Sequence, residues 1–287
     1  MTELQTRFTQ AFEQLKQALS VPVDLPALHV FDTVESTNQI LWHLADGGAQ
    51  PGTVAIALQQ EAGRGQWGRK WKSPAGGLYL SWYLEPHLPV ENAAQLTLCA
   101  TWGVANILRQ CGLPVQIKWL NDLVVGNQKL GGILTETRLK GSKIDRAVIG
   151  IGINWENPVP DTGINLQTVI QQSGHTSEEK QDLGTLEELA ALIWWGLAQA
   201  NHQWQTEGVT SFLADYLELL SHLYCPVSMG DRCGVVVGVN SKGELRVKLM
   251  EGDDPAAATQ TTGEEVVLPP GSISLGYAWT SDRPVQV

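Results

Sequence analysis

The chain of 287 residues has only four cysteines, with no CxxC pair and no histidine cluster beside them. This scarcity argues against a disulfide framework and a zinc site, and it predicts a protein of the reducing cytoplasm. The sequence also lacks a secretory leader pattern and any apolar run of membrane-spanning length, so we expect no membrane association. Basic stretches are missing too, and the net charge of −11 predicts no general affinity for nucleic acid.

Motifs of several familiar enzyme classes are absent. The chain has no GxSxG, HExxH or paired-carboxylate motif and its six histidines are scattered, which disfavours hydrolase chemistry and a dedicated metal site. Gly63 and Gly68 have P-loop spacing, but Arg69 and Lys70 follow where Lys-Ser/Thr is required. The GxG at 150–152 has no third glycine and no following helix, so it is not a dinucleotide fingerprint.

What the sequence does have is a long loop rich in glycine and cationic residues, between apolar runs at 53–58 and 78–84. The loop contains Gly63, Arg64, Gly65, Gly68, Arg69, Lys70, Lys72, Gly76 and Gly77. Glycines let backbone N–H groups approach a ligand, and arginines supply planar charged forks for carboxylate or phosphate. Loops of this kind are also often simply flexible and solvated, but the composition makes an anion-binding loop the first hypothesis.

Hydrophobic periodicity divides the chain into an N-terminal helix with a linker (1–27), a mixed domain of strands and helices (28–222) and a small all-β domain (223–287). Helices are predicted at 2–19, 36–45, 91–111, 185–204 and 209–220, with one helical turn near 166–170. Strands are predicted at 29–31, 53–58, 78–84, 115–119, 123–125, 130–137, 144–154, 235–239, 244–250 and 265–268, with a hairpin turn at Gly126-Asn127. The glycines at 150 and 152 predict the close approach of another backbone or a ligand to their strand.

Polar residues gather where the predicted strands and loops end: Ser36, Thr37, Asn38, Gln60, Arg64, Lys118, Asn121, Asp122, Lys129 and Asn154. Ser36 or Thr37 could simply cap a helix, and a turn lysine such as Lys129 is usually solvated. A functional interpretation places hydroxyls and an amide at a helix N-terminus around a small polar ligand, with Lys129 and Arg64 at its phosphate or carboxylate. The residues by themselves leave both interpretations open.

The sequence closely resembles the biotin protein ligases, also called biotin–[acetyl-CoA-carboxylase] ligases, in five stretches that follow the family's order. These are ESTN (35–38), QEAGRGQWGRKW (60–71), KWLND (118–122), KLGGIL (129–134) and GIGINW (150–155). The resemblance implies an α/β (α+β) catalytic domain with a mixed sheet, related to class II aminoacyl-tRNA synthetases, and a small C-terminal β-barrel domain. It is to the short bacterial form without an N-terminal DNA-binding domain, which disfavours a transcriptional repressor.

The same resemblance implies a two-step activity. Biotin would react with ATP, carried as its Mg²⁺ complex, to give biotinyl-5′-AMP, and the biotinyl group would then pass to a lysine of the biotin carboxyl carrier protein of acetyl-CoA carboxylase. The implied partners are therefore biotin, ATP and the carrier protein, and the enzyme would be a monomer or a homodimer.

Residue roles also follow from the matching motifs. The implied catalytic residues are Lys129 and Arg64, near the biotin carboxylate and α-phosphate, and Lys118 and Asp122, near the phosphates. The implied biotin-binding residues are Ser36, Thr37, Asn38, Gln60, Arg64 and Lys129. The implied ATP-binding residues are Arg64, Arg69, Trp71, Lys118, Asn121 and Asn154.

Two positions depart from the family pattern, with Gln66 where an arginine is frequent and Leu120 where proline is frequent. That arginine helps retain the adenylate, so the departure bears on how tightly the intermediate is held. The nearest rival activity is a lipoate–protein ligase or octanoyltransferase, against which the glycine-rich loop and the KLGGIL stretch argue. A second rival is a binding or regulatory protein that does not turn over, and the presence of Arg64, Lys118 and Lys129 argues against it.

Overall fold

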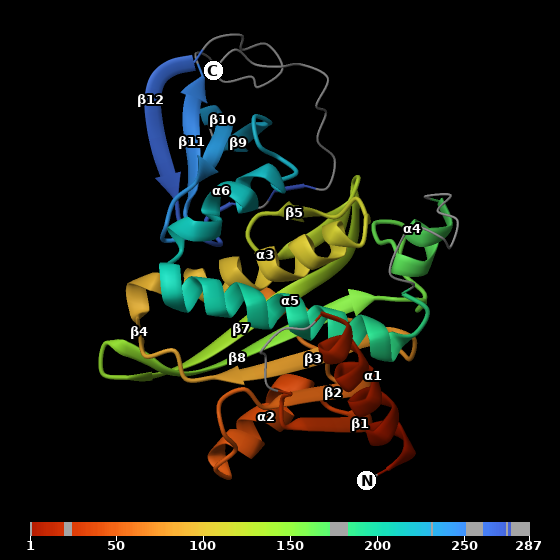
Figure 1. Cartoon of the computed structure of the whole chain (residues 1–287). Helices are drawn as coiled ribbons and strands as arrows, with labels where there is room; N and C mark the ends of the chain where they lie inside the picture. Colours follow the sequence, from red (N-terminus) through yellow and green to blue (C-terminus); the bar gives the residue numbers. More distant parts are fainter. Residues whose placement is uncertain are drawn as a thin grey trace.

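The computed structural model describes residues 2–19, 25–172, 183–230, 232–250, 261–273 and 275–276. Its main element is an eight-stranded mixed sheet in the order β1-β2-β3-β8-β7-β6-β5, with β4 beside β8 (Figure 1). The strands are β1 (Leu28–Val34), β2 (Val54–Gln60), β3 (Gly77–Leu84), β4 (Leu88–Pro89), β5 (Gln116–Lys118), β6 (Asp122–Val125), β7 (Gln128–Lys140) and β8 (Lys143–Asn154). Only β1 and β2 pair in parallel, and the predicted hairpin around Gly126-Asn127 is the antiparallel β6–β7 pair.

The two faces of this sheet are covered by different helices. The helices are α1 (Glu3–Leu19), α2 (Thr37–Asp46), α3 (Ala94–Gln110), α4 (Leu166–Gln172), α5 (Leu186–Glu207) and α6 (Thr210–Glu218), with short 3₁₀ turns at Gln66–Gly68 and Val90–Asn92. Strand side chains alternate between faces, so Val54 and Ile56 join the large core under α3 and α5, whereas Ala55 joins the small cluster under α2. The helix α2 therefore lies on one face alone, opposite α3 and α5 (Figure 1).

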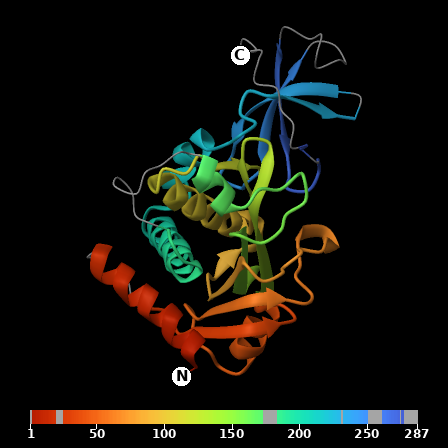
Figure 2. The same cartoon turned by 90° about the vertical axis from the view of Figure 1, so that its right-hand side faces the viewer.

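The helix α1 belongs to the large core. Phe8 and Phe12 are buried in it, and the ring of Phe12 lies 5.7 Å from that of Trp194 on α5. Figure 2 shows α1 running beside α5 at the β1 end of the sheet. Side-chain atoms of Gln5 also bond the outer edge of β1, at Leu28 O and Val30 N. The N-terminal helix thus protects an edge strand that would otherwise expose unpaired backbone groups.

A separate antiparallel sheet follows, in the order β12-β11-β10-β9. Its strands are β9 (Pro226–Met229), β10 (Arg232–Val239), β11 (Leu245–Met250) and β12 (Thr261–Leu268). The predicted C-terminal β domain is confirmed, but within the described residues it is an open four-stranded sheet and not a closed barrel. The sequence interpretation also missed β9, whose PVSM stretch offers little apolar alternation.

Hydrogen bonds hold this second sheet to the helical layer. Trp119 Nε1 donates to Gly243 O at 3.0 Å, and Gln95 Nε2 donates to Ser241 O at 2.9 Å. Trp204 Nε1 in turn donates to Gln95 Oε1 at 3.1 Å, so α3 and α5 share the contact. The β10–β11 turn is therefore docked beside the start of the Trp119–Asp122 segment.

Two expectations from composition can be compared with the structure. All four cysteines are free thiols, and all four are buried. Among the residues that the structure describes, no helix combines the length and the apolar character needed to cross a membrane.

Candidate active site

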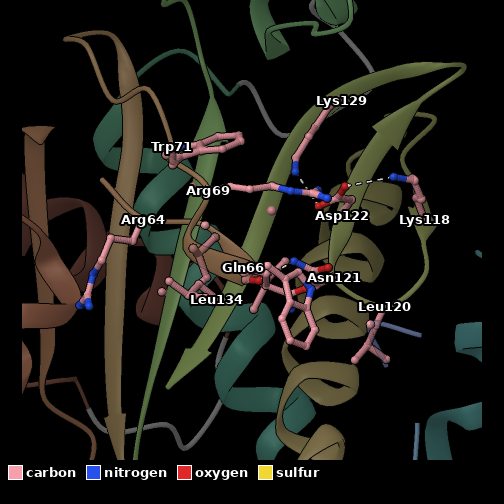
Figure 3. A pocket seen from close by; sticks show the side chains of 18 of the residues that line it. Arg64, Gln66, Arg69, Trp71, Lys118, Leu120, Asn121, Asp122, Lys129 and Leu134 are labelled. Carbon is pink, nitrogen blue, oxygen red and sulfur yellow. Dashed lines mark hydrogen bonds and ion pairs between the residues drawn. The ribbon is translucent and has the colours of Figure 1, made fainter. Parts of the chain in front are cut away.

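A cavity of about 560 Å³ lies on the α2 face of the main sheet (Figure 3). This volume falls within the range of small-molecule sites. Because strand residues alternate, one cross-strand row of β3, β8 and β7 presents Ser81, Gly150 and Leu134, and the next presents Gly152 beside Gly132. The floor of the cavity is therefore largely glycine backbone.

Glycine is required at two points of this floor. A Cβ atom added to Gly150 would collide with Oδ1 of Asn38, and one added to Gly152 would lie 2.6 Å from Nε1 of Trp71. The close approach predicted at 150 and 152 is present, but side chains of α2 and of the loop make it, and not the backbone or ligand that was expected. The room left by these two glycines is what lets both side chains reach the sheet.

One end of the cavity is lined by buried hydroxyl and amide groups. The backbone nitrogen of Thr37 lies 2.9 Å from Gln60 Oε1, and Thr37 Oγ1 lies 3.2 Å from the same oxygen. The Ser81 hydroxyl lies 2.7 Å from Thr37 Oγ1 and 2.6 Å from Asn38 Oδ1. Ser36 stands at the N-cap of α2, but its side chain forms no capping hydrogen bond. It lines the cavity at 3% exposure, so the simple capping interpretation does not account for its hydroxyl.

The other end carries a cluster of cations around one carboxylate. Lys129 Nζ lies 2.6 Å from Asp122 Oδ1, and Lys118 Nζ lies 3.6 Å from Asp122 Oδ2. Arg69 extends from the loop toward the same carboxylate (Figure 3). Lys129 Nζ also lies 5.2 Å from the ring of Trp71, within cation–π range. Three cations face a single anion, which gives this end of the cavity a positive field suited to phosphate or carboxylate.

The cations at this end affect one another. Burial lowers the pKa of Lys118; the neighbouring Lys129 and Arg69 lower it further, while Asp122 raises it. Behind the lysine, burial lowers the pKa of His222 to about 3, and Lys118 adds to the shift. His222 is therefore neutral at physiological pH and adds no positive charge to the cluster.

Two predicted asparagines have supporting positions. Asn121 lines the cavity and donates from Nδ2 to Ile133 O at 2.7 Å, which ties the segment before β6 to β7. Asn154 is not among the described lining residues; its Nδ2 lies 3.4 Å from Lys129 O and 3.3 Å from Ile164 O. Asn154 therefore holds the backbone behind Lys129.

Arg64 is the predicted site residue whose position differs most from expectation. It was expected beside Lys129, but its side chain points away from that lysine (Figure 3). The guanidinium instead pairs with Glu136, with N–O distances of 3.1 and 3.2 Å. Arg69, from the same loop, takes the place near the lysines that was assigned to Arg64.

Sequence reasoning missed several contributors. Ser81 is the only hydroxyl residue with no aromatic ring in the apolar run of β3, a signal that could have been used. Glu136 lies two residues after Leu134 on the same face of β7. It was missed because nothing in the sequence distinguishes it from the other charged residues of that strand. The segment after β12 also lines the cavity, through residues that include Gly271 and Ile273. A Cβ on Gly271 would collide with the ring of Trp67, so the loop touches the C-terminal domain.

Both departures from the family pattern also line the cavity. Gln66 lies in the loop and Leu120 follows a cis peptide bond from Trp119. Tyr216 of α6 donates to Leu120 O at 3.1 Å, which fixes this segment from the side of the helices.

Comparisons with known proteins agree with the geometry. A sequence model of the Biotin/lipoate A/B protein ligase family matches residues 30–154. The bifunctional ligase/repressor BirA of Salmonella typhimurium is 34% identical over 224 residues, covering 75% of this chain and 68% of the relative. BirA of Escherichia coli is 32% identical over 230 residues, covering 78% of this chain and 70% of the relative.

A solved structure is similar over nearly its whole length. The biotin protein ligase from Aquifex aeolicus in complex with biotin and ATP matches with a TM-score of 0.65 and 25% identity, covering 85% of this chain and 99% of that one.

Proposed function

The chain belongs to the biotin protein ligase family, and from that premise we propose that it activates biotin as biotinyl-5′-AMP and transfers the biotinyl group to a carrier lysine. The acceptor proposed is the biotin carboxyl carrier protein of acetyl-CoA carboxylase. A relative from Paracoccus denitrificans, named biotin–[acetyl-CoA-carboxylase] ligase, supports this choice with 28% identity over 225 residues.

The observation that carries the proposal is the polarity of the cavity. One end offers neutral hydroxyl and amide groups from Ser36, Thr37 and Asn38, suited to the uncharged ureido ring of biotin. The opposite end offers Lys118, Lys129 and Arg69, suited to a carboxylate and to phosphates. A single ligand with an uncharged polar head and a carboxylate tail matches both ends at once.

In the first step a biotin carboxylate oxygen attacks the α-phosphorus of ATP, and the bond to the β-phosphate oxygen breaks to release pyrophosphate. Two anions must meet for this reaction, so fixed cations along the path lower its barrier. Lys129 and Lys118 supply that charge without reorganisation, because Asp122 already orients both ammonium groups. Trp71 packs beside Lys129 and lines the cavity, and we assign it to the nucleotide.

In the second step the neutral amine of the carrier lysine attacks the acyl carbon of the mixed anhydride. The bond from that carbon to the phosphate oxygen breaks, AMP leaves, and the amine loses a proton as the amide forms. The cations that favoured the first step also stabilise the departing phosphate. The loop at 63–71 lines the cavity and limits the access of water, which would otherwise hydrolyse the anhydride.

Magnesium would enter as the complex with ATP. Asp122 is the only carboxylate among the described lining residues, and hard oxygen ligands together with substrate phosphates are what Mg²⁺ prefers. The bound ion would neutralise phosphate charge, while the lysines act on the reacting α-phosphate and carboxylate.

The transfer step predicts a covalent product. Incubating the protein with biotin, ATP, Mg²⁺ and a purified carrier domain should add one biotinyl group to that domain, seen by mass spectrometry. A carrier whose target lysine is replaced by arginine is the matched control and should stay unmodified. Biotin-dependent conversion of ATP to AMP and pyrophosphate with no modified carrier would limit the proposal to adenylation.

A further inference from the structure

Glu136 accepts hydrogen bonds from three residues, two on the helix α2 and one in the glycine-rich loop. Its Oε2 accepts from Asn38 Nδ2 at 3.0 Å and from Trp42 Nε1 at 3.2 Å, and both its oxygens contact the guanidinium of Arg64. The carboxylate lies on β7, two residues along from Leu134 of the cavity wall, and its side chain is 23% exposed. None of the motifs that carry the family resemblance includes it.

The first consequence concerns the Asn38 amide. A carboxylate only accepts hydrogen bonds, so its contact fixes Nδ2 toward Glu136 and leaves Oδ1 toward the Ser81 hydroxyl. Because Gly150 has no side chain, the Asn38 amide lies directly against the strand β8. Asn38 is 3% exposed, so without Glu136 its Nδ2 group would be buried and lack this acceptor. A ligand that binds to the oriented amide would then bind more weakly.

The second consequence concerns the glycine-rich loop. The side chain of Arg64 reaches from the loop to Glu136 on β7, through two guanidinium nitrogens and both carboxylate oxygens. An isolated exposed pair of this kind contributes little, and Arg64 is 40% exposed. Glu136, however, is already held by two donors from α2, so the arginine meets an acceptor that is oriented before the loop arrives.

The acceptor is supported from behind. Trp42 donates a hydrogen bond to Glu136, and the guanidinium of Arg138 lies 4.2 Å from the centre of the Trp42 ring. Arg138 in turn pairs with Asp46 at the end of α2. The arrangement ties α2 to β7 on the side of the sheet that bears the cavity.

We propose that Glu136 is a positioning residue of this site: its carboxylate sets the orientation of the Asn38 amide and anchors the loop over the cavity through Arg64. In this arrangement Arg64 is held by Glu136 and fixes the position of the loop. The kinetic part of the test rests on the proposed function, whereas the loop part does not.

The experiment compares Glu136→Gln, Arg64→Gln and the double variant with the parent protein. Hydrogen exchange of the backbone amides in the loop is measured without ligand, and the KM for biotin is measured by pyrophosphate exchange. Glu265→Gln is the matched control, because Glu265 forms a similar two-oxygen pair with Arg246 and neither residue is among those that line the cavity.

Hydrogen exchange of the loop amides should be roughly tenfold faster in each single variant than in the parent. It should be no faster in the double variant, because both changes break the same Arg64–Glu136 contact. The KM for biotin should rise on the order of tenfold in Glu136→Gln, more than in Arg64→Gln, with kcat changed less. Glu265→Gln should match the parent in both measurements.

Unchanged loop exchange in Arg64→Gln would overturn the anchoring role, and an unchanged biotin KM in a folded Glu136→Gln would overturn the role at Asn38. If Glu136→Gln does not fold, Arg64→Gln decides the anchoring role by itself, since its side chain lies at the surface. A parent protein with no biotin-dependent pyrophosphate exchange would contradict the proposed function. The hydrogen-exchange result for the loop would still stand.

Discussion

Replacing Lys129 with methionine should lower the rate of biotin-dependent adenylate formation by roughly 100- to 1,000-fold while the protein stays folded. The ammonium group is the cation closest to Asp122, at 2.6 Å, and it faces the cavity beside Trp71 (Figure 3). The negative charge that builds up as a carboxylate attacks a phosphate needs a cation already in place. Lys118 does not take that position, because it lies on the other side of Asp122.

Methionine suits this test because it keeps most of the apolar stem. The stem packs near Trp71, so a loss of packing contributes little and the missing charge dominates. Pyrophosphate exchange reports the rate, and thermal unfolding reports the fold. Lys140→Met, at the exposed end of the same strand, is the control and should keep the parent rate. Parent-like exchange in a folded Lys129→Met would remove this lysine from the chemistry.

Replacing Gly150 with alanine should weaken biotin binding on the order of 100-fold, because the new methyl group would occupy the place of the Asn38 amide. Moving that amide breaks its contacts with both Ser81 and Glu136. The backbone of Gly150 lies within a regular strand, so alanine brings no conformational strain of its own. The effect should therefore appear in ligand affinity, measured by titration calorimetry.

Gly132→Ala is the matched control for this change. Gly132 lies on the next strand and lines the same cavity, but its added methyl group would meet its nearest neighbours at an ordinary distance of 3.4 Å. Biotin affinity should fall less than tenfold in this variant. Equal losses at the two positions would mean that any bulk in the floor is harmful and that the Asn38 amide has no special part.

Local patterns in the sequence predicted much of the main sheet. Alternation in the run at 78–84 identified β3, and the run at 144–154 identified β8. The glycines at 150 and 152 marked a close approach, although side chains make it and not the expected backbone or ligand. Lys129 was placed beside a hairpin turn, and the turn does bring it over Asp122. These features depend on neighbours within a few residues, which is where periodicity and turn chemistry are informative.

Long-range pairing was beyond that reasoning. Arg64 and Glu136 are 72 residues apart, and either arginine of the loop could have faced the lysines on composition alone. The contact of Trp67 with Gly271 joins the glycine-rich loop to the C-terminal domain, and no local sequence pattern predicts it. The closed barrel expected at the C-terminus is an open sheet in the described residues, because strand number and closure depend on tertiary packing.

The most direct test of the whole account is ATP–pyrophosphate exchange by the purified protein with Mg²⁺ and with biotin, lipoate, octanoate or no acid. The account predicts exchange with biotin alone, because the cavity pairs a neutral polar end with a cationic end. Exchange with lipoate or octanoate in place of biotin would contradict the assignment of the polar end. A folded protein that shows no exchange with any acid would contradict adenylation itself.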